Sequence, residues 1–462
     1  MTLIKSISGI RGTIGGKKGD NLTPEDILAF TRAFALLLMK KTGKKKLRVV
    51  VGRDARQSGS MVLQIIAGTL SGMGIDVTDI GLATTPTVEI AVTGLKADGG
   101  IIITASHNPA QWNALKLLNG IGEFISAEEG TELLQIAEQD SADYAPVDAL
   151  GEINMIKDYE DRHIEQILGL KLVDRKAIAE AGFKIAIDCV NSVGGIAVPK
   201  LLRALGVKDI IELNCTPDGR FAHNPEPLPE NLGDICKLIR KEKADIGLVV
   251  DPDVDRLAMV CEDGTMFGEE YTLVAVSDYV LQNNPGNTVS NLSSTLALRD
   301  VTRKYGWAHH ASAVGEVNVV RKMKEVNAVI GGEGNGGVIY PELHYGRDAL
   351  VGIALFLTHL AKSGMKASEL RKTYPEYVIS KNKIELTPEI NVDRVLFEMK
   401  ELYSGEEYTD IDGLRVTFKN EWVHLRKSNT EPIIRIYAES TTKENADKLA
   451  RKIMDQIMLI AK

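Results

Sequence analysis

The amino-acid sequence predicts an α/β protein with three similar mixed α/β domains followed by a C-terminal α+β domain. Two patterns carry this prediction. A strand–turn–helix–glycine–strand unit occurs three times at widely separated positions, and after residue 368 alternating strands follow with few helices between them. The chain of 462 residues is also too long for a single hydrophobic core, so several domains are expected.

Each repeated unit opens with an apolar segment that predicts a buried strand, and a turn and a helix follow. A glycine then ends the helix. The three copies, given as strand, helix and glycine, are 47–52, 61–73 and Gly74; 183–188, a helix ending at 205 and Gly206; and 287–290, 295–304 and Gly306. Such units build a largely parallel sheet, and their separation predicts three domains rather than one sheet.

The C-terminal part has a different pattern. Strands are predicted at 378–386, 413–418 and 433–439, and a terminal helix is predicted at 443–460. The four expected domains are therefore residues 1–150, 151–255, 256–368 and 369–462.

Composition excludes several classes of protein. The net charge is −8 and no long basic run offsets it, so nucleic acid is not an expected partner. The N-terminus has no signal-peptide pattern and no apolar stretch is long enough to span a membrane, so a cytoplasmic protein is expected. The four cysteines predict reduced core thiols, and His309, His310 and His344, which lack ligand-like spacing, are predicted to be structural.

The most informative stretch is residues 104–109, Thr-Ala-Ser-His-Asn-Pro, which ends the apolar run beginning at Gly99. A buried strand stops there and turns, so the hydroxyl of Ser106 is expected at the carboxyl end of a strand. Open α/β sheets hold their ligands at that edge. No Gly-x-Ser-x-Gly elbow surrounds Ser106, which argues against an acyl-transfer serine.

A second motif places Asp251, Asp253 and Asp255 between two predicted strands. Carboxylates on alternate residues suit a hard cation, and magnesium fits better than calcium because a phosphate oxygen can complete its shell. An EF-hand is disfavoured because Arg256 occupies the required glycine position and the flanks are strands. A solvated turn is the other interpretation. A hydroxyl beside such a cation indicates phosphate chemistry.

A glycine-rich motif occupies residues 332–337, Gly-Glu-Gly-Asn-Gly-Gly. It matches a dinucleotide fingerprint formally, but a strand rather than a helix is predicted at 338–341, so that interpretation fails. Glu333 and Asn335 instead offer an acceptor and an amide on a backbone that can approach closely, which suits sugar hydroxyls. A simple hairpin turn is the alternative.

A fourth motif, Arg-Lys-Ser-Asn-Thr-Glu-Pro at residues 426–432, gathers guanidinium, hydroxyl and amide donors, with Arg435 beyond it. Such a loop can hold a phosphate dianion that is not attacked, whereas an ordinary polar turn is the alternative. Arg11 lies between two glycines and Lys116 follows Ser106 by ten residues. Taken alone, either basic residue is predicted to be a surface charge.

Together, these four motifs in this order resemble the α-D-phosphohexomutase family, which comprises phosphoglucomutases, phosphomannomutases and phosphoglucosamine mutases. The resemblance runs from residue 8 to about residue 438. It implies four domains around a deep central cleft, which carry in turn the phosphoserine, metal-binding, sugar-binding and phosphate-binding loops.

The resemblance also implies roles for single residues. Ser106 is expected to be phosphorylated in the resting enzyme, primed by a hexose 1,6-bisphosphate. The expected ligands of Mg²⁺ are Ser106, Asp251, Asp253 and Asp255. The other expected catalytic residues are His107, Lys116, Arg256 and Arg11. The expected substrate-binding residues are Glu333, Asn335, Arg426, Ser428, Asn429, Thr430 and Arg435.

The implied reaction moves a phosphoryl group between O6 and O1 of a hexose phosphate through a sugar 1,6-bisphosphate. Residues 315–317, Gly-Glu-Val, resemble phosphoglucosamine mutases and favour glucosamine phosphate, whereas the glycine-rich loop is similar to archaeal-type phosphohexomutases. A phosphomannomutase/phosphoglucomutase is the alternative. A noncatalytic sugar-phosphate-binding protein and a magnesium-dependent phosphatase are alternatives of other classes. The expected partners are hexose phosphates, and a homodimer is compatible with this function.

Pro252 and Val254 stand where the family commonly has smaller residues in the aspartate loop. The three aspartates remain, so this departure bears on the flexibility of the loop rather than on metal binding.

Overall fold

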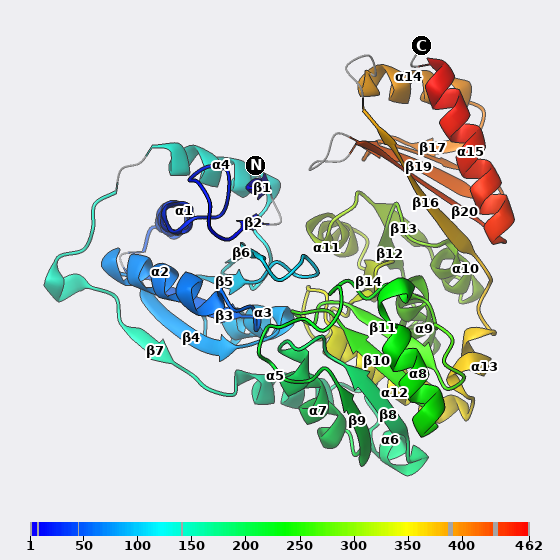
Figure 1. Cartoon of the computed structure of the whole chain (residues 1–462), viewed down its shortest axis with the longest axis horizontal. Coiled ribbons are helices and arrows are strands. Elements are labelled where there is room, and N and C mark those ends of the chain that lie inside the picture. The colour runs from blue at the N-terminus through cyan, green and yellow to red at the C-terminus, as the bar shows by residue number, and fades with distance from the viewer. Residues whose placement is uncertain are drawn as a thin grey trace. The chain divides into compact units, whose positions relative to one another are not determined.

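The computed structural model describes residues 2–6, 9–44, 46–139, 142–386, 391–427 and 433–460. The chain divides into two compact units, and each unit combines two separate stretches of sequence. Figure 1 labels the helices and strands along the chain. The first unit is Met1–Thr272 with Gly336–Leu370, and the second is Leu273–Asn335 with Arg371–Lys462.

The first unit begins with a sheet of seven strands. The elements of this part are β1 (Ile4–Ser6), β2 (Gly9–Thr13), α1 (Pro24–Thr42), β3 (Arg48–Arg53), α2 (Gly59–Gly72), β4 (Asp76–Leu82), α3 (Thr85–Gly94), β5 (Gly99–Ile103), β6 (Trp112–Asn119), α4 (Ala127–Glu138) and β7 (Ile153–Met155). The strand order is β1-β2-β6-β5-β3-β4-β7. β3, β4 and β5 are parallel, and β6 is antiparallel to β5 and β2.

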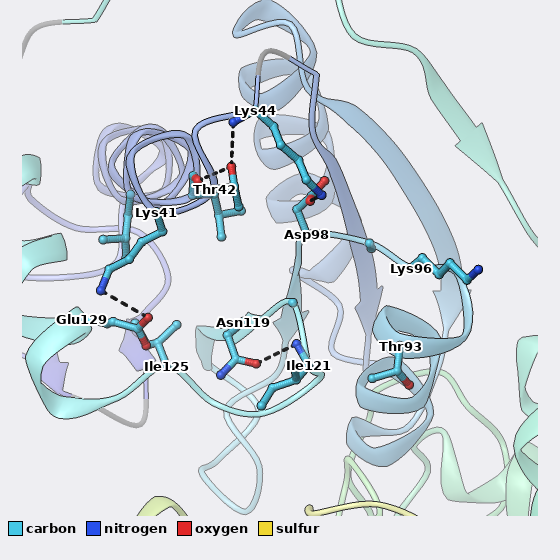
Figure 2. Close-up of a pocket in the computed structure, with 14 residues that line it drawn as sticks. Lys41, Thr42, Lys44, Thr93, Lys96, Asp98, Asn119, Ile121, Ile125 and Glu129 are labelled. Atoms are coloured by element: carbon cyan, nitrogen blue, oxygen red, sulfur yellow. Dashed lines mark hydrogen bonds and ion pairs between the residues drawn. The ribbon is translucent and has the colours of Figure 1, made fainter.

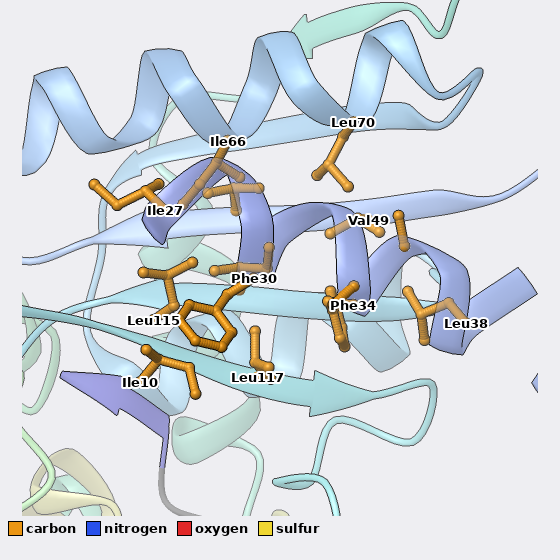
Figure 3. Packing of buried hydrophobic residues seen from close by; sticks show 14 of the residues in the cluster. Ile10, Ile27, Phe30, Phe34, Leu38, Val49, Ile66, Leu70, Leu115 and Leu117 are labelled. Carbon is orange, nitrogen blue, oxygen red and sulfur yellow. The ribbon is translucent and has the colours of Figure 1, made fainter. Parts of the chain in front are cut away.

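Alternating side chains of this sheet point to two separate cores. Val49 and Val51 of β3 pack in the core that α1 and α2 cover, where Phe34 and Ile66 are fully buried (Figure 3). Val50, between them, packs in the other core, which contains the side chains of α3. Because successive strand residues face opposite sides, a sheet covered on both faces needs apolar residues at every position. The continuous apolar run in β3 is therefore the signature of a three-layer arrangement.

The first unit continues with a sheet of four strands in the order β11-β10-β8-β9. The elements that follow β7, up to this sheet's last strand, are α5 (Tyr159–Leu168), α6 (Arg175–Ala181), β8 (Lys184–Asp188), α7 (Gly194–Ala204), β9 (Asp209–Leu213), α8 (Gly233–Glu242), β10 (Ile246–Val250) and β11 (Leu257–Cys261). β10 is fully buried and pairs with β8 in parallel and with β11 in antiparallel orientation. The turn between β10 and β11 carries the three aspartates. β15 (Gly337–Ile339), α12 (Ala349–Ser363) and α13 (Ala367–Arg371) follow much later in the chain.

The second unit contains a parallel and an antiparallel arrangement of strands. Its elements are α9 (Glu269–Asn283) from Leu273 onward, β12 (Thr288–Asn291), α10 (Leu296–Lys304), β13 (His309–Ser312), α11 (Glu316–Glu325), β14 (Ile330–Glu333), β16 (Val378–Glu385), α14 (Val392–Leu402), β17 (Glu407–Thr409), β18 (Leu414–Thr417), β19 (Trp422–Lys427), β20 (Ile433–Ser440) and α15 (Lys443–Ile460). β12 pairs in parallel with β13 and β14. β16, β20, β19, β18 and β17 form an antiparallel sheet.

The predicted strand–turn–helix–glycine units are confirmed. β3 with α2, β8 with α7 and β12 with α10 lie at the predicted positions, and Gly74, Gly206 and Gly306 all have positive φ angles. The terminal helix is also confirmed, whereas β6 and β19 are strands that the sequence analysis did not predict. Within the described residues, no helix is long and apolar enough to cross a membrane. All four cysteines are free, as predicted.

A buried cluster of charged groups joins three helices of the first unit. The Nε2 atoms of His163 and His344 lie 2.9 and 3.3 Å from Oδ2 of Asp348, so both imidazoles donate to that carboxylate. Oδ1 of Asp348 accepts from the backbone N–H groups of Leu350 and Val351 in the first turn of α12, and Nδ1 of His344 lies 3.2 Å from Oε2 of Glu89 on α3. The donor atoms of His163, His344 and Asp348 lie within 4.8 Å of one another, a spacing that a metal ion would also tolerate, but hydrogen bonding accounts for the cluster.

The pKa of His344 follows from these contacts. Burial alone would lower it, but the hydrogen bonds and charges of Asp348 and Glu89 outweigh burial and raise the pKa to about 10. The imidazole is therefore a largely buried cation between two carboxylates at neutral pH. His344 is structural, as predicted, and it ties α3 to the N-terminus of α12.

We expect the stability of the protein to depend on pH through His344. Its pKa is raised from an unfolded value of about 6.5 to about 10. Its contribution is therefore complete below about pH 6.5 and is lost as the pH rises toward 10. In urea unfolding, His344→Gln should lower the free energy of unfolding at about pH 6 and flatten its decline over this window. His310→Gln is the control for replacing a histidine outside this cluster. Parallel curves for His344→Gln and the unmutated protein would contradict this assignment.

Candidate functional site

The Ser106 loop leaves the carboxyl end of β5, as predicted. Ser106 has a φ of +47°, a left-handed conformation that is uncommon for a residue other than glycine. Its backbone N–H donates to Oγ1 of Thr104, and its Oγ donates to Oδ2 of Asp251 over 2.8 Å. The structure thus brings together the hydroxyl and the aspartate loop that the sequence singled out, although 145 residues separate them.

A buried arginine that sequence reasoning missed holds the Ser106 loop. Arg56 donates from Nη2 to the carbonyl oxygens of Ser106 and Asn108, at 2.5 and 2.7 Å, and from Nη1 to those of Pro109 and Trp112, at 2.7 and 3.0 Å. Its Nε donates to the fully buried Asp54 over 3.0 Å. Four carbonyls on one guanidinium fix the path of the loop, because five N–H donors in a rigid plane allow little rearrangement.

Burying the carboxyl group of Asp54 in this network is electrostatically unfavourable. Burial raises the pKa of its carboxyl group, while the neighbouring Arg56 and the hydroxyl of Thr104 oppose that rise. Thr104 Oγ1 donates to the same carboxylate over 2.7 Å. Asp54, Arg56 and Thr104 therefore form one buried network that contacts the backbone of Ser106. The local sequence Asp54-Ala-Arg56 gave no motif that distinguishes it from a polar turn.

The aspartate loop places three carboxylates at one point. Asp251, Asp253 and Asp255 are all fully buried, and one oxygen from each lies within 4.8 Å of the others. Val254 adopts a φ of +62° and donates its N–H to the carbonyl of Asp251 over 3.1 Å. A left-handed residue turns the chain sharply, so alternate side chains converge. The convergence predicted from the spacing is confirmed, and a solvated turn is excluded.

Three cations from separate segments face these carboxylates. Lys116 Nζ lies 2.7 Å from Oδ2 of Asp253 and 3.5 Å from Oδ2 of Asp255. Arg347 Nη2 donates to Oδ2 of Asp255 over 2.6 Å, and Arg256 Nε lies 3.8 Å from Oδ1 of Asp255. Lys116 is buried, so the interpretation of its isolated motif as a surface charge is wrong. Arg347 was missed because no local pattern marks it.

The pKa values follow this distribution of charge. Burial would raise the pKa of Asp253, but the charge and hydrogen bond of Lys116 and the hydroxyl of Thr85 outweigh it and lower the pKa. Burial would likewise lower the pKa of Lys116, but Asp253 and Asp255 raise it. Thr85 Oγ1 donates to Asp253 Oδ2 over 2.7 Å from the first turn of α3. Asp253 is therefore ionised and Lys116 is protonated at neutral pH.

The donor set fits a hard divalent cation. Asp253 Oδ1 and Asp255 Oδ1 are buried and have no hydrogen-bond partner among the described residues. Burial, then the charges of Asp255 and Asp253, raise the pKa of Asp251 well above its ordinary range. Three carboxylates at this spacing repel one another, and a divalent cation between them would remove that repulsion. Oxygen donors alone favour a cation such as Mg²⁺ over softer metals.

Arg11 and His107 lie close to this cluster. Arg11 is on β2, opposite Ala114 of β6, and burial followed by the charge of Arg256 lowers its pKa. The charge of Arg256, then burial and Arg11, hold the pKa of His107 well below its usual range, so its imidazole is neutral. His107 Nδ1 lies 3.3 Å from the hydroxyl oxygen of Ser106. The structure thus groups all five of the sequence-predicted catalytic residues in the first unit.

The sugar-binding residues expected from the glycine-rich loop lie in the second unit. Glu333 ends β14, and its Oε1 accepts from Asn291 Nδ2 over 2.8 Å and from the backbone N–H of Gly315 over 3.1 Å. Asn335 follows in the turn. A strand, β15, begins at Gly337, which confirms that the segment is no dinucleotide fingerprint.

The predicted phosphate-binding loop begins at the end of β19. Arg426 donates from Nε to Oδ1 of Asp412 over 3.2 Å, and its backbone lies opposite Arg435 of β20. The predicted residues Ser428, Asn429 and Thr430 lie outside the described residues. Asp412 was not identified from the sequence.

A separate pocket of about 500 Å³ lies in the first unit, lined by the end of α1 and by residues 93–98 and 119–129 (Figure 2). Two of the three lysines that line it lie beside carboxylates. Lys41 lies 3.7 Å from Glu129, and Lys44 lies 2.5 Å from Asp98. None of the predicted site residues lines this pocket, and it offers no comparable chemistry.

Comparison with known families gives four matches in chain order. Phosphoglucomutase/phosphomannomutase α/β/α domains I, II and III match residues 3–143, 161–264 and 268–377, and the C-terminal domain of the same family matches residues 382–456. Three related α/β domains and a distinct fourth domain confirm the predicted fold class. The domain boundaries named from the sequence stay a prediction.

Several curated proteins resemble the chain over nearly its full length. A phosphoglucomutase/phosphomannomutase of Thermococcus kodakarensis is 37% identical, with 94% of this chain and 95% of that protein covered. A probable phosphoglucosamine mutase of Methanopyrus kandleri is 34% identical, with 97% and 96% covered. A phosphoglucosamine/phosphogalactosamine mutase of Sulfurisphaera tokodaii is 32% identical, with 96% and 97% covered.

Solved structures agree with this similarity. A phosphoglucomutase/phosphomannomutase family protein of Burkholderia thailandensis superimposes with a TM-score of 0.85 at 27% identity, covering 100% of this chain and 98% of that one. The N-acetylphosphoglucosamine mutase of Aspergillus fumigatus, solved with GlcNAc-6P and magnesium, superimposes with a TM-score of 0.58 at 16% identity, covering 100% and 96%. The second likeness shows a shared fold.

We expect Arg56 to be essential for the order of the Ser106 loop. Arg56→Met removes a buried cation from Asp54 and four carbonyls, so the free energy of unfolding should fall by about 3 kcal/mol. Amide hydrogen exchange of residues 105–112 should accelerate more than that of β5. Arg53→Met, which removes one bond to the Asp54 carbonyl, is the control and should cost about 1 kcal/mol or less. Unchanged exchange of the loop in Arg56→Met would show that other contacts hold it.

Proposed function

Because the chain belongs to the phosphoglucomutase/phosphomannomutase family and is a phosphohexomutase, we propose that it interconverts glucosamine 6-phosphate and glucosamine 1-phosphate through a phosphorylated Ser106. The observation that carries the phosphoserine mechanism is the 2.8 Å contact between Ser106 Oγ and Asp251 within the buried aspartate loop. A nucleophilic hydroxyl at a cation site, surrounded by basic side chains, suits phosphoryl transfer.

The proposed first step transfers the phosphoryl group from Ser106 to a free hydroxyl of the bound sugar phosphate. The bond between phosphorus and Ser106 Oγ breaks, a bond to the sugar oxygen forms, and the proton of the attacking hydroxyl replaces the phosphoryl group on Ser106. The product is a hexose 1,6-bisphosphate. After the sugar turns over, its other phosphate returns to Ser106 by the reverse exchange, so no water enters the balance.

The residues around Ser106 supply the electrostatic part of this mechanism. A phosphoserine carries close to two negative charges at neutral pH and repels an anionic substrate. Lys116 is held protonated by Asp253 and Asp255, and Arg256 and Arg11 add fixed positive charge. Asp251, Asp253 and Asp255 would hold Mg²⁺, which, when bound, neutralises the charge of the phosphoryl oxygens. Positioning and neutralisation are the main contributions that phosphoryl transfer requires from a protein.

The substrate would be held by residues of the second unit. Glu333 and Asn335 are proposed to bind sugar hydroxyls, and Arg426 with Ser428, Asn429, Thr430 and Arg435 is proposed to bind the phosphate that does not react. Arg426 can grip a phosphate of either end of the sugar, because a guanidinium recognises the phosphate and not its carbon atom. The reaction requires a site that binds either phosphate equally, because the two phosphates exchange positions.

The preference for glucosamine rests on the charge of the second-unit loops. Gly315, directly before Glu316, donates to the buried carboxylate of Glu333. Carboxylates at the sugar-binding loop favour a substrate with an ammonium group, which glucosamine carries and glucose and mannose lack. The phosphoglucosamine mutases among the relatives support this choice. The alternative, a phosphomannomutase/phosphoglucomutase, is favoured by the relative at 37% identity.

We expect purified protein incubated with glucose 1,6-bisphosphate to gain one phosphoryl group on Ser106. Intact-mass spectrometry and peptide mapping would locate it. Ser106→Ala should lose both the phosphate and more than about 99% of the turnover, because it removes the hydroxyl that contacts Asp251 and is proposed to carry the phosphoryl group. Ser60→Ala, an exposed position on α2, is the control. Phosphate on Ser106 without sugar turnover would favour a binding protein, and release of inorganic phosphate would favour a phosphatase.

We expect kcat/KM for glucosamine 6-phosphate to exceed the values for glucose and mannose 6-phosphate by about tenfold, or about 1.4 kcal/mol. Glu333→Gln should reduce this ratio, because it removes the charge that attracts the ammonium group while keeping the size of the side chain. A tenfold preference for glucose or mannose phosphate in the unmutated protein would establish the alternative substrate.

A further inference from the structure

We propose that Asp412, on the turn between β17 and β18, is a positioning residue that couples the phosphate-binding arginine to the sugar-binding loop. Its two carboxylate oxygens serve different segments of the second unit. Oδ1 accepts from Arg426 and Oδ2 accepts from the backbone N–H of Val314. The inference rests on the proposed function, since it assumes that Arg426 binds phosphate and that Glu333 binds the sugar.

The contact with Arg426 leaves the guanidinium oriented but not saturated. Asp412 Oδ1 lies 3.2 Å from Nε, on one edge of a planar group that carries five N–H donors. Both side chains are about a quarter exposed, at 23% each, so the pair is only partly screened by water. A carboxylate at Nε fixes the plane of the guanidinium and leaves its Nη edge as the geometry that recognises a phosphate bidentately.

The contact with Val314 leads to the sugar-binding loop. Val314 N–H lies 3.0 Å from Asp412 Oδ2, and the next residue, Gly315, donates its N–H to Glu333 Oε1 over 3.1 Å. Asn291 Nδ2 donates to the same oxygen of Glu333 over 2.8 Å. Two consecutive backbone N–H groups therefore join the carboxylate that orients Arg426 to the carboxylate proposed to bind the sugar.

The position of Asp412 is itself fixed by its neighbours. Gly413 has a φ of +73°, and a Cβ there would lie 2.1 Å from the carbonyl oxygen of Leu425, so the turn is pressed against β19. The carbonyl of Asp412 accepts from His424 Nε2 over 2.7 Å. Nδ1 of the same imidazole lies 2.9 Å from the hydroxyl of Ser293, which precedes α10. Burial lowers the pKa of His424 to about 4, so the ring is neutral and Nδ1 accepts from Ser293.

Asp412→Asn separates the two contacts. The amide oxygen can still accept from Val314, but the side chain no longer offers a carboxylate to Arg426. In contrast, Asp412→Ala removes both contacts. Asp410, two residues earlier, is exposed and paired with Lys400, and Asp410→Asn is therefore the matched control for a lost carboxylate on the same turn.

The experiment is calorimetric titration of the purified full chain with glucosamine 6-phosphate and, separately, with inorganic phosphate. We expect Asp412→Asn to weaken both ligands by about fivefold to tenfold, the size expected for one charge-assisted hydrogen bond. Asp412→Ala should weaken glucosamine 6-phosphate further, because the loop that contacts Glu333 is released, without a further effect on inorganic phosphate. In an Arg426→Gln background, Asp412→Asn should add nothing. Asp410→Asn should bind both ligands as the unmutated protein does.

Each other result overturns the inference. Tighter binding by Asp412→Asn would show that the carboxylate competes with phosphate rather than positioning the arginine. An undiminished effect in the Arg426→Gln background would show that Asp412 acts elsewhere, and equal effects of Asp412→Ala on the two ligands would remove the link to the sugar loop. If the unmutated protein bound no hexose phosphate, the proposed function would fail together with the inference. If the unmutated protein binds hexose phosphate and Asp412→Asn binds both ligands equally well, the inference is wrong while the proposed function stands.

Discussion

Three carboxylates buried at one point are the constraint on which the first unit depends. Asp251, Asp253 and Asp255 repel one another, and the protein compensates with Lys116 and Arg347, supplied from segments 137 and 92 residues away from their partners. Neither cation could be moved without leaving buried charge unpaired. The seven-stranded sheet supplies Lys116 from β6, the segment before α12 supplies Arg347, and the turn between β10 and β11 holds the three aspartates.

The residues around these carboxylates fix the orientation of the loops and helices that carry the charged groups. Thr85 presents the start of α3 to Asp253, and Arg56 holds the path of the Ser106 loop through four carbonyls. The cation of His344 joins α3 to the start of α12, directly beside Arg347. Phosphoryl transfer depends on rigid support of this kind, because correct positioning of the reacting groups lowers most of the activation barrier.

The sequence predicted the parts of the fold and site that local patterns encode. Apolar runs followed by glycine-terminated helices predicted the three α/β units. The spacing of the aspartates on alternate residues predicted that their side chains converge. Arg56, Arg347 and Asp412 carry no local signal, because each acts through a partner that only the tertiary fold brings near. Arg56 lies 50 residues from Ser106, and Asp412 lies 98 residues from Val314. The burial of Lys116 was missed for the same reason. Its charge is compensated by Asp253, which lies 137 residues away in the sequence.

The discontinuous first unit has a consequence for how the protein is made. α12 is almost wholly buried in that unit, yet residues 273–335, which belong to the second unit, are synthesised before it. During synthesis, residues 1–272 therefore leave the ribosome before residues 336–370, and the apolar surface that α12 covers stays exposed in that interval. The newborn chain is vulnerable to aggregation during that interval, and the segment that ends it is the one that also delivers Arg347.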